Sequence, residues 1–468
     1  MSREADLVVI GAGPGGYVAA LRAAQLGAKV ILVERKYVGG VCLNEGCIPI
    51  KVLLRSAEVL ALAERASEFG VDVGTPKLNW ATVQARKSQL VRQITQQVEL
   101  LLRKAGVDIL WGTARFTSPR TVQVDMQDGA ERVEANRFIV AAGSHATRPP
   151  IPGLDHPDVM DHVAALSIER LPQSLLIIGG GAEGAEFANA FRAYGVKVTL
   201  IELLPHLLPV LDAELGVGLG FAFAQRGIKV YVGASVTALK PGGDGLIASL
   251  RTPNGEERVD AEKVLVCTGR RPNVDGLGLD AAGVRYGSRG VEVDKQQRTS
   301  VPHIYAIGDM TGGKMLAHSA SRQAEIAVSS AIEGAQMMGD SAVPSCVFTD
   351  PEIASVGLSE EEALQHGYNV QVGKFSLSGN GKALVSGESE GFVKVVSEQE
   401  YGEVLGVHII GSHASDLILE GTLALTLEVT LDELEAAVHP HPTLGEAVAE
   451  AVLAVRGRAI HSPKSYSR

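Results

Sequence analysis

Short apolar runs separated by glycine-rich turns mark the strands of the first part of the chain. Residues 7–10 form one such run, and the glycine-rich stretch 11–16 follows it directly. A helical pattern then extends to residue 26, and a second apolar run over 29–33 ends in Glu34. This order of strand, glycine loop, helix, strand and acidic residue predicts a βαβ unit that binds a dinucleotide.

The same pattern returns in the middle of the chain. The apolar run 175–178 meets the glycine loop 179–184, a helix is predicted to residue 194, and the strand 197–201 ends in Glu202. The acidic residue follows the third motif glycine at the same spacing in both copies. We therefore expect two dinucleotide-binding units of one design.

The glycines of the two loops have separate expected roles. Gly11 permits a tight turn, Gly13 lets the backbone approach a pyrophosphate at the helix N-terminus, and Gly16 lets helix and strand pack closely. The corresponding positions of the second loop are Gly179, Gly181 and Gly184. Glu34 and Glu202 are expected to accept hydrogen bonds from ribose hydroxyls. Because Glu202 would repel a 2′-phosphate and no arginine stands beside it, the second unit favours NAD over NADP.

Other patterns predict the remaining organisation. The amphipathic run 82–104 covers only about three heptads, so it indicates a long domain helix rather than an oligomerisation stalk. Strand-like runs follow at 107–111, 121–124 and 137–140, with a turn signal between the last two at 127–129. From residue 344 the chain alternates β-patterned runs with helices and has no nucleotide motif.

These elements predict an α/β fold with two Rossmann-like dinucleotide-binding domains and a C-terminal α+β domain. The segment 267–273 is typical of a crossover between the two nucleotide units, and the buried strand at 304–309 is expected to return to the first one. The expected division is 1–148 for the first part of the first unit, 149–271 for the second unit, 272–343 for the return, and 344–468 for the C-terminal domain.

Two of the four cysteines, Cys42 and Cys47, lie close together in a glycine-rich stretch. On a regular helix their Cα atoms would lie about 8 Å apart, beyond the roughly 7 Å limit for a disulfide. A bridge therefore requires irregular backbone, which three glycines can supply: Gly39, Gly40 and Gly46. A helix is predicted to start just past Pro49 and to cover 51–66. Thiols at its N-terminus would have lowered pKa values.

The cysteine spacing alone leaves three interpretations open. Half of a zinc site would need two more nearby Cys or His ligands, and the neighbouring sequence has none. A structural disulfide is disfavoured because no signal peptide is recognised. Redox catalysis is the third interpretation, and the flanking nucleotide motifs favour it. We expect no metal.

Composition narrows the possible partners. The chain has 468 residues, 46% of them hydrophobic and 21% charged, which suits a multidomain globular protein. A net charge of −11 and a pI near 5.6 argue against nucleic acid or an anionic membrane as partner. No apolar run reaches the ~18 residues of a membrane span. We expect a cytoplasmic location.

The order of motifs resembles the FAD-dependent pyridine nucleotide–disulphide oxidoreductases, and most closely their dihydrolipoamide dehydrogenase group. The resemblance covers nearly the whole chain. The positions that match the family's motifs are 11–20, 42–51, Glu186, 306–309, 315–318 and 441–446. It implies FAD in the first unit, NAD in the second and a dimer-interface role for the C-terminal domain. The implied cofactor contacts further include Lys51, Gly143, Gly269, Gly308, Asp309 and Ala317.

The resemblance also implies a reaction. Dihydrolipoamide on the carrier domain of a 2-oxoacid dehydrogenase complex would be oxidised to lipoamide while NAD is reduced. Cys47 would lie next to the flavin and Cys42 would face the substrate. Lys51 and Glu186 would pair near the flavin, with a surface charge as the alternative interpretation of each.

His441 is the expected acid–base catalyst because it fits the family's His-Pro-Thr motif. A neutral imidazole can take the proton of a dithiol substrate, and Glu446 could hold the other ring nitrogen. His439 is the rival candidate, and a packed interface histidine is the non-catalytic alternative. Since His441 lies far along the chain from Cys42, the family's arrangement implies that it acts in the other subunit of a homodimer.

Several positions depart from the family pattern. Glu45 lies between the two cysteines and is expected to raise their pKa values by like-charge repulsion. Glu183 stands in the second glycine loop where an apolar residue is usual, and it is expected to weaken NAD binding. Further departures are Val41, Ile50, Ala142 and Lys314. These changes keep open two alternatives: an NAD(P)H-dependent reductase of another small disulfide, and a non-catalytic flavin and NAD redox sensor. Glutathione-type relatives are disfavoured by Glu202, and mercuric reductases by the lack of a C-terminal cysteine pair.

Overall fold

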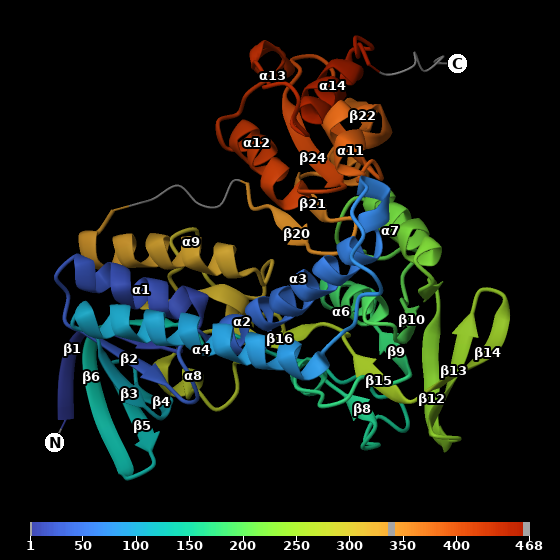
Figure 1. Cartoon of the computed structure of the whole chain (residues 1–468). Coiled ribbons are helices and arrows are strands. Elements are labelled where there is room, and N and C mark those ends of the chain that lie inside the picture. The colour runs from blue at the N-terminus through green and yellow to red at the C-terminus, as the bar shows by residue number, and fades with distance from the viewer. Residues whose placement is uncertain (1, 336–341, 462–468) are drawn as a thin grey trace.

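The computed structural model describes residues 2–335 and 342–461 (Figure 1). Two α/β units lie side by side, and a third unit packs above them in this view. The first two are the expected dinucleotide-binding units, and the third is the expected C-terminal α+β unit. The predicted fold class is therefore confirmed.

The first unit is built on a mostly parallel sheet. Within the described residues it has seven strands in the order β3-β2-β1-β6-β5-β4, with β19 also paired to β6. The strands are β1 Ser2–Ile10, β2 Val30–Glu34, β3 Asp108–Trp111, β4 Thr113–Ser118, β5 Thr121–Met126, β6 Gly129–Val140 and β19 Ile304–Ala306. Because β1 pairs in parallel with β2 and β6, the loop at 11–16 opens at the middle of the sheet.

Helices cover this sheet through small buried side chains. Ala19, Ala20 and Ala23 of helix α1 (Pro14–Gln25) are fully buried. They let α1 pack closely in the first unit, where helix α9 (Ala317–Val328) lies beside it (Figure 1). Helix α9, in the part of the chain that returns from the second unit, therefore packs beside the first glycine loop.

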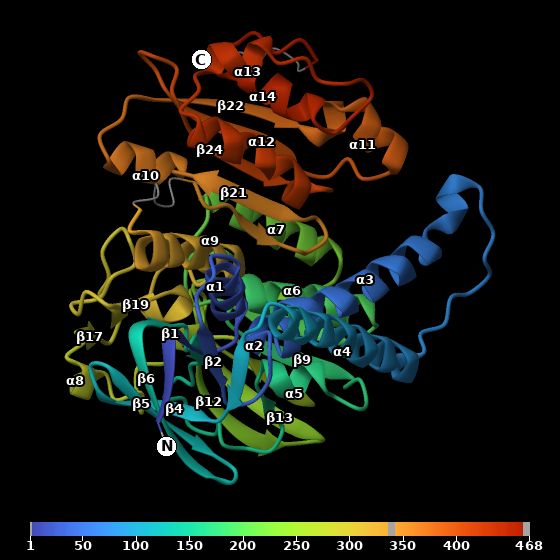
Figure 2. The same cartoon turned by 90° about the vertical axis from the view of Figure 1, so that its left-hand side faces the viewer.

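A group of three helices connects the first unit to the second. These are α2 (Gly40–Asn44), α3 (Cys47–Glu64) and α4 (Trp80–Lys104). Figure 2 shows α3 and α4 running side by side. The Asn79 side chain caps α4 by accepting from the backbone N–H of Thr82. The long amphipathic run is thus a domain helix, as predicted.

The second unit has a five-stranded parallel sheet in the part of the chain that the structure describes, in the order β11-β10-β9-β15-β8. Its strands are β8 Val159–Met160, β9 Ser174–Ile178, β10 Lys197–Ile201, β11 Lys229–Tyr231 and β15 Lys263–Val266. Its helices are α5 His162–Leu166, α6 Ala182–Ala193 and α7 Ala213–Gln225. An antiparallel sheet lies beside it and contains β12 Ser235–Gly242, β13 Gly245–Thr252 and β14 Gly255–Ala261.

Two chain crossings join these units. Strand β7 (Ser144–Ala146) leaves the first unit and pairs antiparallel with β16 (Arg270–Pro272), which comes back from the second. This two-stranded ribbon places the segment 267–273 at the junction, as the sequence predicts. The return then includes α8 Leu279–Ala282, β17 Tyr286–Gly287, β18 Gly290–Val291 and the 3₁₀ helix η2 Gly308–Thr311.

The C-terminal unit is an antiparallel sheet, among the described residues, in the order β20-β21-β24-β23-β22. Its strands are β20 Ser345–Val347, β21 Ile353–Gly357, β22 Val370–Ser376, β23 Phe392–Glu398 and β24 Val404–Ile410. Its helices are α10 Glu360–Gln365, α11 Gly381–Ser386, α12 Ala414–Thr426, α13 Leu431–Ala436 and α14 Glu446–Val455. Across residues 2–335 and 342–461, no helix is both long and apolar enough to cross a membrane.

Three local expectations need correction. The helix expected just past Pro49 already begins at Cys47, because proline in the first helical turn sacrifices no intrahelical hydrogen bond. Strand β6 begins at Gly129 rather than near 137, since it extends into a hairpin with β5. Strand β4 and the antiparallel sheet at 235–261 were not predicted.

Candidate active site

The two cysteines flank a break between two helices. Cys42 lies in α2, which ends at Asn44, and Cys47 is the first residue of α3. Gly46 between them has backbone angles that are neither helical nor extended (φ −143°, ψ −105°). The irregular backbone that a Cys42–Cys47 bridge requires is therefore present. All four cysteines of the chain are unpaired thiols in this structure.

The cysteine loop rests directly on the first glycine loop. The backbone N–H of Gly39 donates to the carbonyl of Ala12 at 2.8 Å. Gly40 has a left-handed backbone (φ +55°), and a Cβ there would lie 2.7 Å from the Cα of Gly13. Glycine at position 40 is thus required by both conformation and contact. The packing fixes the thiols next to the expected flavin pyrophosphate site.

The two thiols have opposite electrostatic character. The hydrogen bond from the Cys42 thiol, assisted by the charge of Lys51 and opposed by burial, lowers the pKa of Cys47 to about 7. The same hydrogen bond, together with burial, raises the pKa of Cys42 far above its ordinary range. Near neutral pH, Cys47 is therefore the thiolate and Cys42 the thiol that donates to it.

Glu45 does not act on the thiols as expected. Its carboxylate binds the Lys36 ammonium at 2.5 Å, and the Lys36 and Tyr37 hydrogen bonds outweigh burial to lower the pKa of Glu45. The pKa of Cys47 is lowered, not raised. The predicted like-charge effect is wrong for Cys47, because the Cys42 hydrogen bond and the Lys51 charge determine the direction of its pKa shift.

Lys51 and Glu186 form the predicted pair. The Lys51 Nζ atom lies 2.8 Å from both carboxylate oxygens of Glu186, so α3 and α6 are bridged. The Glu186 side chain is only 6% exposed, and the backbone N–H of Phe348 also donates to it at 3.1 Å. Lys51 further lies 4.5 Å above the Phe348 ring. The lysine is thereby held beside the cysteines.

One cavity of about 700 Å³ collects most of the expected flavin contacts. It is lined by Cys42, Cys47, Lys51, Glu186, Gly11, Gly13, Glu34, Gly143, Gly308, Asp309 and Ala317. The first loop fits a flavin dinucleotide by its open space. Nothing lies within 4 Å of a Cβ built on Gly13, whereas a Cβ on Gly16 would lie 1.8 Å from the carbonyl oxygen of Gly11. Gly13 therefore leaves room for a ligand, and Gly16 allows the start of helix α1 to pack closely against the end of strand β1.

The second loop repeats this geometry. Gly181 has open space at its Cβ position, and a Cβ on Gly184 would lie 1.9 Å from the oxygen of Gly179. Gly179 itself has a left-handed backbone (φ +109°). The loop therefore fits a second dinucleotide by the same criterion. The cysteine cavity is lined by Ala182 and Glu183 of this loop but not by the expected NAD contacts Gly179, Gly181, Gly184, Glu202 and Gly269. The start of the loop and Glu202 lie at the carboxyl ends of β9 and β10.

The two acidic residues at the strand ends occupy equivalent positions. Glu34 accepts from the backbone N–H of Ala12 at 2.8 Å, and Glu202 accepts from that of Gly180 at 2.7 Å. Each carboxylate also accepts an N–H from its own following turn, Lys36 or Leu204, at 2.8 Å. A carboxylate has about four acceptor sites, so both keep capacity for a ribose hydroxyl.

Two polar residues of the cavity, Ser144 and Arg270, were not predicted as site residues. Ser144 donates to the Asp309 carboxylate at 2.5 Å and accepts from Arg270 at 2.7 Å. This chain connects β7, β16 and η2, the three segments at the crossover. The positions of Ser144 and Arg270 beside the predicted crossing were the available signal, but only the fold shows that they meet Asp309.

Cys346 was also not predicted to lie near the other cysteines. It lines the same cavity from strand β20. Burial and the nearby Glu352 carboxylate raise its pKa to about 11, so it stays a protonated thiol near neutral pH. The distance in sequence gave no signal for this placement.

His441 and Glu446 pair with each other but not with the cysteines of their own chain. The His441 Nδ1 atom lies 2.9 Å from a Glu446 carboxylate oxygen. The His441 side chain is 79% exposed and does not line the cysteine cavity. The rival His439 pairs instead with Glu420 at 2.9 Å and is 12% exposed. Of these two histidines, His441 is thus the one whose side chain is accessible to another molecule.

Comparison with known proteins agrees with this arrangement. Residues 5–324 match the family model of pyridine nucleotide-disulphide oxidoreductases, and residues 343–452 match the dimerisation domain of the same family. The chain is 41% identical to a dihydrolipoyl dehydrogenase of Bacillus subtilis over 98% of this chain and 100% of that protein. It is 43% identical to a dihydrolipoyl dehydrogenase of Thermus scotoductus over 97% and 98%. The crystal structure of LpdA from Mycobacterium tuberculosis superposes with a TM-score of 0.87 at 28% identity, covering 97% of this chain and 99% of that one.

Proposed function

The chain belongs to the pyridine nucleotide-disulphide oxidoreductase family, and we propose that it is a dihydrolipoyl dehydrogenase that oxidises dihydrolipoamide and reduces NAD. The observation that carries this proposal is the joint placement of a low-pKa thiolate, a second thiol and the Lys51–Glu186 pair in one cavity beside the first glycine loop. Relatives of this name, similar over nearly the full length, do not favour the alternative small-disulfide reductase or redox sensor.

The cofactors are FAD and NAD. The first glycine loop, Glu34, Asp309 and the cavity beside Cys47 would hold FAD, and the second loop with Glu202 would hold NAD. When bound, FAD would supply the two-electron carrier between the reduced cysteine pair and NAD. The chain's own residues bind and orient both cofactors and handle the thiol chemistry.

The cysteines would carry out disulfide exchange in balanced steps. A thiolate of dihydrolipoamide attacks the Cys42 sulfur of the oxidised Cys42–Cys47 pair, and Cys47 leaves as a thiolate. The second substrate thiol then loses its proton and attacks the first substrate sulfur, which releases lipoamide and displaces Cys42 as a thiolate. Cys42 takes up the proton that the second substrate thiol lost and becomes a thiol. Two electrons now reside in the cysteine pair. Lys51 holds the Cys47 thiolate electrostatically, in agreement with the pKa of about 7.

The proton acceptor would be the partner subunit's His441. Within a chain, Glu446 fixes His441 through the Nδ1 atom, which leaves the Nε2 atom to take the proton of a substrate thiol. The exposure of His441, and the match of residues 343–452 to a dimerisation domain, support a site shared between two copies. A homodimer is therefore part of the proposal.

The physiological substrate would be a lipoyl carrier domain of a 2-oxoacid dehydrogenase complex, and the location would be the cytoplasm. The division of the chain into 1–148, 149–271, 272–343 and 344–468 is also proposed. The crossing strands β7 and β16 and the start of β20 support its three boundaries.

The proposed function is tested by turnover with two substrates. The purified protein should be yellow, contain one FAD per chain, and form NADH with free dihydrolipoamide far faster than with reduced glutathione. Cys42→Ser should abolish the reaction with dihydrolipoamide while NADH still bleaches the flavin. A colourless protein, or equal rates with both thiols, would refute the proposal.

A further inference from the structure

A carboxylate that the reaction above does not use faces the cysteine cavity from the second nucleotide unit. Glu183 lies in the first turn of α6, directly after the second glycine loop. It lines the same cavity as Cys47 and Lys51, and its side chain is 30% exposed. Glu183 therefore faces the cysteine cavity from the second glycine loop.

The position of Glu183 along α6 places it on the path of the nicotinamide. Glu186 lies three residues further on, hence on the same helix face, and is already bound to Lys51 beside Cys47. A dinucleotide whose pyrophosphate rests on the second glycine loop must extend its reactive ring toward this point. It therefore passes the side chain of Glu183.

Glu183 retains an unbalanced charge at this place. The His162 Nδ1 atom lies 3.4 Å from a Glu183 carboxylate oxygen, and within the described residues neither of these atoms has a hydrogen-bond partner. The other charged groups that act on Glu183 are Arg270, Glu186 and Asp161. Arg270 is hydrogen-bonded to Ser144, and Glu186 is neutralised by Lys51. His162 thus orients the carboxylate without fully satisfying it.

The two redox forms of the ligand differ in charge at the ring. The nicotinamide of NAD⁺ is a cation, and that of NADH is neutral. We propose that Glu183 is a specificity-determining residue that makes the site bind NAD⁺ in preference to NADH, through the charge of its partly buried carboxylate. This inference rests on the proposed function for the identity of the ligand. It favours the direction of reaction in which NAD⁺ enters and NADH leaves.

The preference depends on the ionisation of Glu183. Burial raises the pKa of Glu183, while His162 and Arg270 oppose that effect. The carboxylate is therefore lost at a higher pH than an ordinary glutamate would lose it. The preference for NAD⁺ should be present at high pH and should decline as the pH falls through this raised pKa.

The test compares ligands on the flavin-loaded protein by titration calorimetry. The ligands are NAD⁺, a redox-inert tetrahydronicotinamide analogue with a neutral ring, and ADP-ribose, which lacks the ring. Glu183→Gln should reduce the preference for NAD⁺ over the neutral analogue by roughly tenfold, since one charge at close range in a partly buried site contributes at least about 1.4 kcal/mol. Affinity for ADP-ribose should not change, and Glu183→Asp should keep most of the preference.

Glu169→Gln is the matched control, because it removes a carboxylate from an exposed residue that does not line the cavity. If Glu183→Gln loses its flavin, Glu183→Ile is measured instead, with the apolar kind of side chain usual in the family. If the ratio of the affinities for NAD⁺ and the neutral analogue is the same in Glu183→Gln, or in Glu183→Ile where that is measured, as in the wild type, the inference is overturned. A wild-type protein that binds NAD⁺ with this preference but does not oxidise dihydrolipoamide would refute the proposed function alone.

Discussion

Lys51 and the Cys42 thiol together lower the pKa of Cys47, so the cysteine pair should titrate in a recognisable way. In the dithiol-reduced protein, alkylation of Cys47 should follow a thiolate with a pKa of about 7. Lys51→Met removes a nearby positive charge and should raise this pKa by roughly one unit. Alkylation rates across pH, read on the Cys47 peptide by mass spectrometry, provide the measurement.

Arg55→Met is the control for this substitution. Arg55 lies one helical turn after Lys51 on α3, and it is paired with Glu58 at the surface. Its removal should leave the Cys47 profile in place. Equal profiles for Lys51→Met and the wild type would contradict the electrostatic role of Lys51.

His441 provides a second prediction at the residue scale. His441→Gln should reduce turnover with dihydrolipoamide by about 10²- to 10⁴-fold, because proton transfer from the substrate thiol loses its acceptor. Reduction of the flavin by NADH should remain, since His441 does not line the cavity. Stopped-flow measurement of the two half-reactions separates these steps. Equal loss in both would indicate a structural defect instead.

Residue types at fixed spacing made much of the site predictable, including two of its ion pairs, but other ion pairs of the site were not predictable. The Lys51–Glu186 and His441–Glu446 pairs were predicted and are present. The effect of Glu45 was wrongly predicted for Cys47, because the sequence does not show that the Cys42 hydrogen bond and Lys51 together lower the pKa of Cys47. The His162–Glu183 contact joins helices α5 and α6 of the second unit and has no sequence signal of its own.

At the scale of elements, the first glycine loop and helix α1 together form the proposed FAD-binding element. Gly13→Ala would fill open space at the ligand side, so it should weaken FAD binding and leave the apoprotein's fold intact. Gly16→Ala would place a Cβ against the backbone of Gly11, so it should also destabilise the fold by about 1–3 kcal/mol.

Flavin content and the urea midpoint of the apoprotein distinguish these two effects. Gly27→Ala is unsuitable as a control because Gly27 has a left-handed backbone. Gly13→Ala and Gly16→Ala serve as controls for each other, since the two glycines lie three residues apart around the start of α1. A Gly13→Ala variant as unstable as Gly16→Ala would contradict the distinct roles.

Elements with strong periodicity were predicted best. The two βαβ units and the long helix α4 follow from their apolar patterns and glycines. The start of α3 was misplaced because Pro49 was interpreted as a helix boundary, although proline is tolerated in the first turn. The antiparallel strands at 235–261 were missed because their pairing with one another, rather than a nucleotide motif, defines them.

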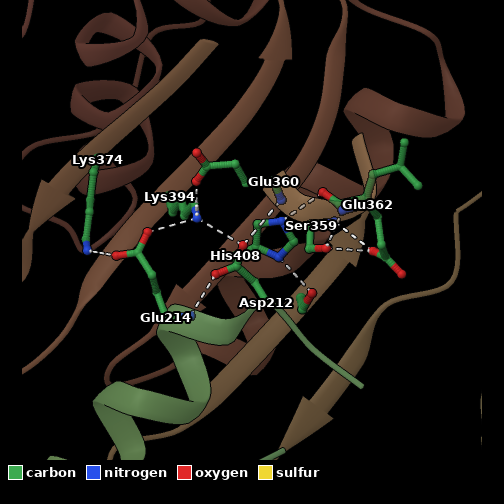
Figure 3. A network of polar contacts seen from close by, with 10 residues as sticks. Asp212, Glu214, Ser359, Glu360, Glu362, Lys374, Lys394 and His408 are labelled. Atoms are coloured by element: carbon green, nitrogen blue, oxygen red, sulfur yellow. Dashed lines mark hydrogen bonds and ion pairs between the residues drawn. The ribbon is translucent and has the colours of Figure 1, made fainter. Parts of the chain in front are cut away.

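At the scale of the whole molecule, a buried ion cluster joins the second unit to the C-terminal unit (Figure 3). Lys394 of β23 is 2% exposed and lies 2.8–3.0 Å from carboxylates of Asp212, Glu214 and Glu360. Asp212 and Glu214 belong to the start of α7, whereas Lys394 and Glu360 belong to the C-terminal unit. The cluster therefore fixes the position of the unit that carries His441.

Removal of Lys394 should destabilise this junction. Lys394→Met leaves the buried Asp212 carboxylate without its ion-pair partner and should cost about 3–5 kcal/mol of unfolding free energy. Lys374→Met is the control, because Lys374 is 43% exposed and contacts Glu214 at the surface, where a pair contributes about 0–1 kcal/mol. Thermal and urea unfolding give the measurement, and equal loss in both variants would contradict the role of burial.

The pH dependence of this cluster has a definite sign. Burial would raise the pKa of Asp212, but His408 and the bond to Lys394 outweigh it and lower that pKa. The Asp212 contribution to stability is therefore full above the unfolded pKa of about 3.9 and is lost as the pH falls through the lower folded value. Lys394→Met should remove much of this acid-sensitive stability.

The central claim is that two copies of the chain share each active site, with Cys42 and Cys47 from one and His441 from the other. Heterodimers of a Cys42→Ser chain and a His441→Gln chain, isolated with two different affinity tags, test it directly. A shared site predicts about half of the wild-type rate of NADH formation from dihydrolipoamide, because one of the two sites is then intact. Each mutant homodimer should be nearly inactive. Purified heterodimers as inactive as the two homodimers would contradict the account.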